Sequence, residues 1–199
     1  MPSTPPTTKA LIAANVFVFV LQAIVGPGLI ALLGLWPIQG GFMPWQLLSY
    51  GFLHGGLTHL LFNLFGIWMF GGELERVWGS SRLLSYFITC VFGAAVAQLL
   101  VAAYTGNPYP TLGASGGLFG LLLGFAAVFP RRIVTPLIPP IPMPAWLFVT
   151  LYGLLELVLG VTGSATGIAH FAHLGGLAAG LLTLRFWRGQ FPFRKGGGR

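Results

Sequence analysis

Charged side chains are scarce in this sequence. Its 199 residues contain ten Lys or Arg, three Glu and no Asp, so that 7% of the chain is charged. Ordinary soluble domains carry about 25% charged residues. Hydrophobic residues make up 55% of the chain, and the mean hydropathy is +0.84. This composition excludes an ordinary soluble domain and indicates a membrane protein that crosses the bilayer several times.

Cysteine is almost absent as well. Cys90 is the only cysteine and lies in an apolar run, which excludes a disulfide within the chain and suggests no thiol site. Residues 1–8 lack basic side chains, are rich in Pro and Thr, and do not resemble a cleaved signal peptide. The first apolar segment is therefore expected to stay in the protein as a membrane anchor.

Long apolar runs are present instead. Each comes near the ~20 residues that an α-helix needs to cross a bilayer, although the fourth and fifth are short. The six segments are residues 10–32, 52–71, 83–103, 115–129, 144–160 and 168–187. They predict an all-α membrane protein, folded as a six-transmembrane-helix bundle in a single domain over residues 1–199, with short polar tails at both ends.

The positive charges follow one topological pattern. They lie before segment 1, between segments 2 and 3, between segments 4 and 5, and from the end of segment 6 onwards: Lys9, Arg76, Arg82, Arg131, Arg132, Arg185, Arg188, Arg194, Lys195 and Arg199. Lys and Arg mark the cytoplasmic side of a membrane protein, so both termini are expected to be cytoplasmic. The net charge of +7 then reflects topology rather than nucleic-acid binding. We expect an integral multi-pass protein of a bacterial or archaeal plasma membrane.

Two further features bear on the architecture. Residues 130–144 contain six prolines, which predict a rigid cytoplasmic turn rather than a helix. No convincing internal repeat is found, and this disfavours the inverted-repeat architectures of many transporters.

Polar side chains inside membrane spans are costly and face the bundle interior or a water-filled cavity. Four stand out here: His59 and Asn63 in segment 2, Ser115 at the start of segment 4, and His173 in segment 6. Counted from the basic residue at each inner end, the two histidines and the serine lie roughly 18–25 Å above the inner face, at ~1.5 Å per residue. Three segments therefore bring polar groups to a similar level in the outer half of the bilayer.

Small residues predict which segments touch. Glycines four residues apart occur in both segment 4 and segment 6: Gly116, Gly120 and Gly124, and Gly176 and Gly180. This spacing lets membrane helices approach closely. Ser115 and His173 lie at the outer ends of these two faces, so we expect them within hydrogen-bonding reach, as a nucleophile and its base require.

A third, acidic partner is missing from this prediction. Glu73 and Glu75 fall by a cytoplasmic loop, and Glu156 lies at an outer level of segment 5 with no motif around it. We therefore predict a Ser-His dyad, with Ser115 as nucleophile and His173 as general base. His59, Asn63 and the backbone N–H of Ser115 are candidate donors to an oxyanion. No metal and no other cofactor is expected.

These residues resemble the motifs of the rhomboid intramembrane serine proteases. Gly113-Ala114-Ser115-Gly116 is similar to the family's G-x-S-G motif, whose serine is the nucleophile. Residues 173–180 are similar to its H-x-x-G-x-x-x-G helix, whose histidine is the base, and residues 59–63 to its H-x-x-x-N oxyanion motif. Residues 71–76 resemble the end of its second span, where a glutamate and an arginine anchor the helix. The resemblance covers about residues 45–180.

The resemblance implies hydrolysis of transmembrane helices, admitted sideways past segment 5 and cleaved near small residues where the helix unwinds. Gly113, Gly116, Gly176 and Gly180 would support the site. Two positions depart from the family pattern. Gln46 stands where many members have an arginine that anchors the first loop. Phe119 stands where some have tyrosine, and its ring could still pack on the histidine without offering a hydroxyl.

Other interpretations remain open. Ser115 could be a helix cap, and His59 with Asn63 could join helices by hydrogen bonds. The chain could be a catalytically inactive rhomboid-like protein that binds membrane helices. It could also bind a metal or haem through its four histidines, although no carboxylate or thiolate ligand is expected beside them. We interpret His170 as a supporting polar residue, and His54 as lining the water path or supporting the loop. We expect Glu156 to reach the bilayer surface or a partner on another helix rather than to act in catalysis.

Overall fold

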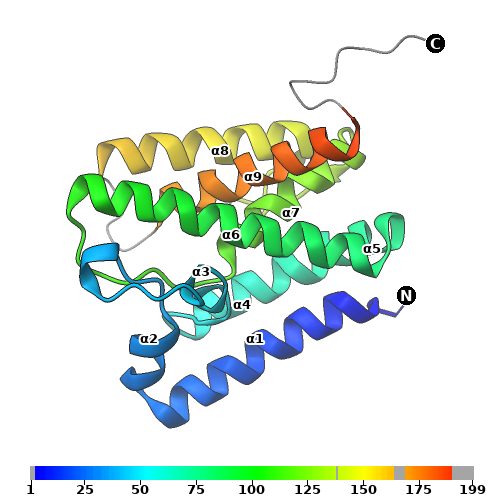
Figure 1. Ribbon diagram of the computed structural model, residues 1–199. Coiled ribbons are helices and arrows are strands. Elements are labelled where there is room, and N and C mark those ends of the chain that lie inside the picture. Colours follow the sequence, from blue (N-terminus) through cyan, green and yellow to red (C-terminus); the bar gives the residue numbers. More distant parts are fainter. Residues whose placement is uncertain (1–2, 138, 164–168, 190–199) are drawn as a thin grey trace.

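The computed structural model describes residues 3–137, 139–163 and 169–189, which fold into a bundle of helices (Figure 1). The long helices are α1 (Pro6–Val25), α6 (Ser80–Thr105), α7 (Ser115–Val128), α8 (Ala145–Thr162) and α9 (His170–Trp187). A sixth rod is built from α4 (Leu57–Gly66), the π-helical turn η3 (Ile67–Gly71) and α5 (Gly72–Trp78). The all-α prediction is confirmed over these residues.

Three of the helices are long and apolar enough to cross a membrane by length and composition: α1, α6 and α8. The apolar helix α7 is shorter, and the rod of residues 57–78 is divided by its π-helical turn. Taken end to end, that rod is about 33 Å long at ~1.5 Å per residue, which is close to the thickness of the hydrocarbon core. The structure is thus consistent with an integral membrane protein.

The first predicted segment, residues 10–32, is not one helix. It divides into α1 and α2 (Pro27–Leu33) at Gly26, whose φ of 73° is a conformation that favours glycine. Pro27 then begins the second helix, where its missing N–H costs nothing. The apolar composition continues through this break, so the prediction of a single span over residues 10–32 was wrong.

Between α2 and α4 the chain forms a compact loop with three short helices: η1 (Ile38–Gly40), α3 (Gln46–Ser49) and η2 (Tyr50–Phe52). Gln46, at the position where an anchoring arginine was in doubt, is fully buried. Its Oε1 accepts hydrogen bonds from the backbone N–H groups of Trp36 and Met43, each at 3.2 Å. A neutral amide therefore anchors this loop.

The core lies where α6, α7 and α9 pack together, with α8 against α9 on the outside (Figure 1). Tyr86 of α6 donates its hydroxyl to the carbonyl of Gly120 in α7 at 3.0 Å. The glycines make the close approach possible, because a Cβ on Gly175 would meet the carbonyl oxygen of Gly93 at 2.9 Å. These contacts fix the positions of α7 and α9 against α6.

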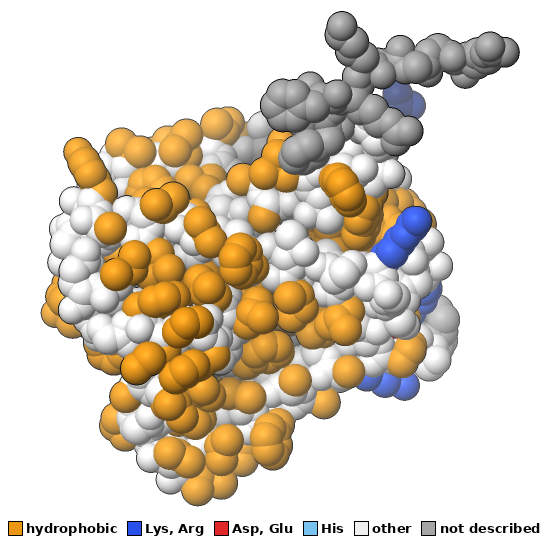
Figure 2. Space-filling view, viewed as in Figure 1, with side chains coloured by type: hydrophobic (Ala, Val, Ile, Leu, Met, Phe, Trp, Pro, Cys, Tyr) orange, Lys and Arg blue, Asp and Glu red, His pale blue; other side chains and the backbone are white. Residues whose placement is uncertain are grey.

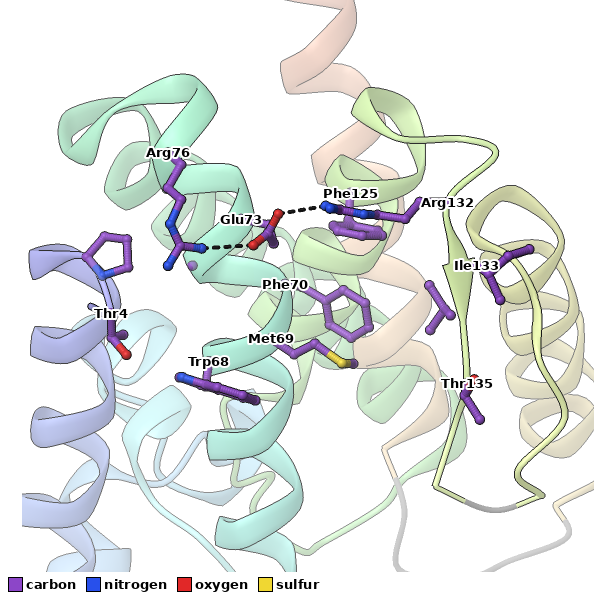
Figure 3. A pocket seen from close by; sticks show the side chains of 13 residues that line it. Thr4, Trp68, Met69, Phe70, Glu73, Arg76, Phe125, Arg132, Ile133 and Thr135 are labelled. Carbon is purple, nitrogen blue, oxygen red and sulfur yellow. Dashed lines mark hydrogen bonds and ion pairs between the residues drawn. The ribbon is translucent and has the colours of Figure 1, made fainter. Parts of the chain in front are cut away.

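The basic residues gather at one end of the molecule, at the right-hand edge of Figure 2, whereas hydrophobic side chains cover much of the visible face. Glu73 forms ion pairs with Arg76 at 2.9 Å and Arg132 at 2.6 Å, as Figure 3 shows. A cavity of about 360 Å³ opens beside them, lined also by Thr4 near the start of the described chain. The far end of α9 lies here too, with Arg82 over the Trp187 ring.

The proline-rich turn contains regular structure that was not predicted. Ile133–Val134 (β1) and Met143–Pro144 (β2) pair as a two-stranded antiparallel ladder with Ile133 opposite Pro144. The absence of helix from this turn is as expected among the described residues, of which residue 138 is not one. The ladder leads directly into α8 and fixes where that helix begins.

Candidate active site

Ser115 and His173 meet where α7 and α9 begin. The hydroxyl oxygen of Ser115 lies 2.8 Å from Nε2 of His173, a hydrogen-bond distance between residues that are 58 positions apart. His173 is buried, and Ser115 is the first residue of α7. A hydroxyl beside an imidazole nitrogen is the arrangement from which a histidine can withdraw the proton of a nucleophile.

The loop before α7 aims this serine. Gly113 has a φ of 126°, which only glycine adopts readily, and its N–H donates to the carbonyl of Tyr50 at 3.0 Å. A Cβ on Gly113 would also meet Nε2 of His59 at 2.8 Å. Glycine is thus required here twice, once by the backbone turn and once by the close approach of the histidine ring.

Glycine contacts bring α7 and α9 to the distance that the hydrogen bond needs. A Cβ on Gly176 would overlap the carbonyl oxygen of Gly116, and one on Gly180 would meet the Tyr86 hydroxyl at 2.5 Å. Packing also orients the imidazole, because the Phe119 ring stacks on His173 with centroids 4.4 Å apart and planes 6° from parallel. Phe119 restricts the ring without competing for its hydrogen bonds.

His59 and Asn63 lie on α4, across the site from His173. The N–H of Gly55 approaches Nδ1 of His59 at 3.4 Å, which leaves Nε2 as the ring nitrogen that carries the proton toward the site. Asn63 donates one amide hydrogen to the carbonyl of His59 at 2.9 Å and keeps a second. Nε2 of His59 and Oγ of Ser115 both lie within 3.6 Å of the point where a Gly113 side chain would begin.

A cavity of about 770 Å³ gives access to these groups. Its lining includes the four polar residues that were predicted to meet: His59, Asn63, Ser115 and His173. Gln98 of α6 and Phe119 line it as well. The first backbone N–H groups of α7 have no partner within the helix, as at every helix N-terminus. The cavity therefore combines a hydroxyl, a base and several hydrogen-bond donors.

Comparison with known proteins places this arrangement in a family. The Rhomboid domain model matches residues 41–189. The chain belongs to the Rhomboid family.

Several curated relatives are similar over most of this rhomboid. RHOMBOID-like protein 4 of Arabidopsis thaliana is 32% identical over 145 residues, 69% of this chain and 32% of the relative. Rhomboid protease GluP of Bacillus subtilis is 32% identical over 147 residues, 70% and 25% of the two chains. Rhomboid protease GlpG of Klebsiella pneumoniae is 30% identical over 181 residues, 88% and 61%. The chain thus spans less than two thirds of the length of these relatives.

Glu156 of this rhomboid meets partners on another helix, which was one of its two predicted places. It does not reach the bilayer surface but is buried beside both histidines of α9. Its Oε2 lies 2.6 Å from Nδ1 of His170 and 2.9 Å from Nδ1 of His173. The first contact has hydrogen-bond geometry, whereas the second is an ion-pair distance with an unfavourable angle. A carboxyl group inside an apolar span is a functional signal in itself, and this signal could have found Glu156.

The carboxylate of Glu156 also forms a group of possible metal ligands with the two histidines of α9. Glu156, His170 and His173 offer ligand atoms that all lie within 4.8 Å of one another. The expectation that no carboxylate lies beside the histidines was therefore wrong. Two of these atoms already contact one another, since Oε2 accepts the Nδ1 hydrogen of His170, and Nε2 of His173 faces Ser115.

His54 supports the site from behind rather than lining the cavity. Its ring is fully buried and meets that of His59 edge to face, with centroids 5.0 Å apart. Its backbone is held by Gln22 of α1, whose amide exchanges two hydrogen bonds with the N–H and C=O of His54. Of the two predicted roles of His54, the structure does not place its side chain at the cavity, whereas the bonds between its backbone and Gln22 agree with support of the loop.

Proposed function

We propose that this rhomboid is an intramembrane serine endopeptidase that hydrolyses peptide bonds of transmembrane substrates with a Ser-His dyad. The observation that carries the proposal is the 2.8 Å contact between Ser115 Oγ and His173 Nε2 at the wall of a large cavity. Two relatives named rhomboid proteases, GluP and GlpG, support it by similarity.

The chemistry follows the general scheme of serine hydrolases. Ser115 Oγ attacks the scissile carbonyl carbon while His173 Nε2 accepts the hydroxyl proton. The imidazolium then gives that proton to the leaving amine, and the C–N bond breaks to leave an acyl-serine. Water attacks the acyl carbon with His173 again as base, and the serine is regenerated as the carboxylic product leaves.

Charge that develops on the carbonyl oxygen needs donors. His59 Nε2, the free amide hydrogen of Asn63 and the N–H of Ser115 border the same cavity and are proposed to fill this role. The oxyanion and the serine would thereby share the space in front of Gly113, whose lack of a side chain keeps that space open.

The proposed membrane topology has six spans: α1, the rod as far as residue 71, α6, α7, α8 and α9. The basic end carries Arg76, Arg82 and Arg132 and lies beside both described ends of the chain. Because positive residues mark the cytoplasmic side, we assign both termini there and the cavity to the opposite side, in a bacterial or archaeal plasma membrane. Transmembrane substrates would reach the cavity from the bilayer.

The test is a cleavage assay in detergent or liposomes with a model transmembrane substrate. Wild-type protein should cleave it, whereas Ser115→Ala should stay folded and give no product. An inactive helix-binding rhomboid would hold the substrate without cleaving it, and wild-type protein would then give no product under any condition. A Ser115→Ala variant as active as wild type would refute the serine mechanism.

A further inference from the structure

Glu156 is an isolated buried carboxyl group on α8, most of whose residues are exposed or partly exposed. Among the residues of α8, all of which the structure describes, it is the only buried one after Val149. Its neighbours Leu155 and Leu157 are exposed. Placing an ionisable group at such depth is costly unless its partners repay the desolvation, so its contacts need an explanation.

Those contacts continue the Ser115–His173 pair by one more step. Oε2 of Glu156 faces Nδ1 of His173 at 2.9 Å, while Nε2 of the same ring faces Ser115 Oγ at 2.8 Å. The order carboxylate, imidazole, hydroxyl is the one in which an acid orients the base of a nucleophile. The chain has only two other acidic residues, Glu73 and Glu75, and both lie at the basic end.

His170 holds the carboxylate in this place. It lies one helical turn before His173, and its Nδ1 donates to Oε2 at 2.6 Å, the shorter of the two contacts. The groups that face His173 are then Ser115 from α7, Glu156 from α8, His170 from its own helix and His59 from α4. Within the described chain, α6 contributes to this cavity only the neutral amide of Gln98.

We propose that Glu156 is a positioning residue that turns the Ser115–His173 dyad into a triad, with His170 orienting the carboxylate. Glu156 holds the proton of neutral His173 on Nδ1, so that Nε2 is free to accept from Ser115. When His173 takes the Ser115 proton at Nε2, the negative charge of Oε2, which lies 2.9 Å from Nδ1, stabilises the imidazolium. This inference rests on the proposed function.

The inference also links substrate admission to chemistry. Apart from Glu156, the residues that α8 buries lie in its first two turns, near the β1–β2 ladder: Ala145, Phe148 and Val149. Outward movement of the other half of α8 would break the contacts of Glu156 with both histidines. The base would then be fully aligned only when α8 is closed against α9.

The experiment compares Glu156→Gln and Glu156→Met for kcat, KM, labelling of Ser115 by a fluorophosphonate, and thermal unfolding. Gln can still accept one hydrogen bond but has no charge, and Met is an apolar side chain of similar size. We expect kcat to fall about 100-fold or more in Gln and further in Met, with labelling falling in parallel and KM within about twofold. The midpoint of thermal unfolding should fall more in Met than in Gln, because Met leaves the buried Nδ1–H of His170 without an acceptor, so all rates are measured at a temperature where both variants are folded.

Matched variants separate positioning from packing. Leu155→Met, on the exposed face of α8, should keep the wild-type kcat. The kcat of His170→Ala should fall less than that of Glu156→Met. The kcat of the double variant Glu156→Met/His170→Ala should be no lower than that of Glu156→Met alone, because both residues act through the contact between Glu156 and His173. A folded Glu156→Met protein with wild-type kcat would overturn the inference, and so would a kcat that is lost only at temperatures where the variant unfolds. If wild type and Ser115→Ala behave alike, the proposed function fails instead.

Discussion

The two ends of this molecule treat buried polar groups in opposite ways. At the basic end, the Glu75 carboxylate accepts four hydrogen bonds of 2.7–2.8 Å from Thr7, Thr8 and Ser80. At the cavity end, buried side-chain atoms of the described residues lack partners on His54, Asn63, Gln98, His170 and His173; Asn15 in α1 is the other case. A polar group whose hydrogen bonds are all made to protein is typical of a structural anchor, whereas polar atoms without a protein partner are typical of a site that binds water or substrate.

This contrast also explains why the cavity end tolerates such groups. Asn63 and Gln98 line a cavity of about 770 Å³, large enough for water, whereas His170 is packed between helices. Unpaired groups that border a cavity can be satisfied by a bound substrate, so their cost is recovered when the site is occupied. The predictions below test whether the two ends differ in function as they do in bonding.

The largest expected effect is on the base. His173→Ala should reduce kcat at least about 1000-fold, because no other group within the described site faces Ser115 Oγ as a proton acceptor. His170→Ala, one turn away, is the matched control and should keep measurable activity. Turnover and fluorophosphonate labelling measure both variants. Equal losses in the two would leave the choice of base unsupported.

The oxyanion donors come next. His59→Ala should lower kcat about 100- to 1000-fold with little change in KM, because a donor to developing charge acts mainly in the transition state. Asn63→Ala should lose less, since His59 and the Ser115 N–H would still donate. The double variant should lose much more than either single one. Wild-type rates in both single variants would make these residues structural members of α4 rather than oxyanion donors.

The proximity of Ser115 and His173 can be predicted from the sequence because each residue lies on the same helix face as the glycines through which α7 and α9 touch. Gly116 and Gly176 sit one residue after Ser115 and three after His173, so the helix repeat itself carries both polar groups to the contact. The particular partners of Glu156 could not be named from the sequence, for the opposite reason. Its approach to α9 depends on how α8 is rotated and tilted, and an apolar helix with one polar residue does not encode that rotation.

Other features of the fold that the sequence did not predict are breaks within helices. The Gly26-Pro27 pair is a recognised break signal, yet the apolar run continues through it, so composition outweighed the local signal. The π-helical turn at residues 67–71 leaves the hydrophobic pattern of its rod unchanged and depends on packing. Sequence periodicity reports which residues are apolar, whereas such breaks are set by tertiary contacts.

Substitution at the contact between Gly176 and Gly116 is expected to lower kcat by an intermediate amount. In Gly176→Ala, the new methyl group would overlap the carbonyl oxygen of Gly116 and push α9 away from α7. We expect kcat to fall about 10- to 100-fold, with a smaller loss of thermal stability, because a ~1 Å displacement can cost ~100-fold in rate. Gly153→Ala is the matched control, since its Cβ would meet only Leu177 Cδ1 at 3.4 Å. Unchanged turnover in Gly176→Ala would show that this contact does not set the distance between serine and histidine.

The smallest effect on activity is expected at the basic end. Glu75 lies in α5, beyond the predicted span that ends at residue 71. Burial alone would raise the pKa of Glu75, but hydrogen bonds from Ser80, Thr7 and Thr8 outweigh it and lower the pKa from 4.5 to about 2. A lowered pKa stabilises the folded state above the unfolded pKa, and this stabilisation is lost as the pH falls toward the folded one.

Glu75→Gln should therefore reduce the free energy of unfolding by about 3 kcal/mol at neutral pH, on the scale of ~1.4 kcal/mol per pKa unit. The difference from wild type should shrink between pH 4.5 and about 2, where the wild-type carboxylate becomes protonated. Denaturation followed in detergent across this range measures it. At neutral pH and at temperatures where both proteins are folded, kcat should stay within about twofold of wild type, because Glu75 anchors α5 to the start of α1 and touches no site residue. A large loss of kcat in a fully folded Glu75→Gln protein would mean that the basic end is coupled to the cavity, and the contrast between the two ends would fail.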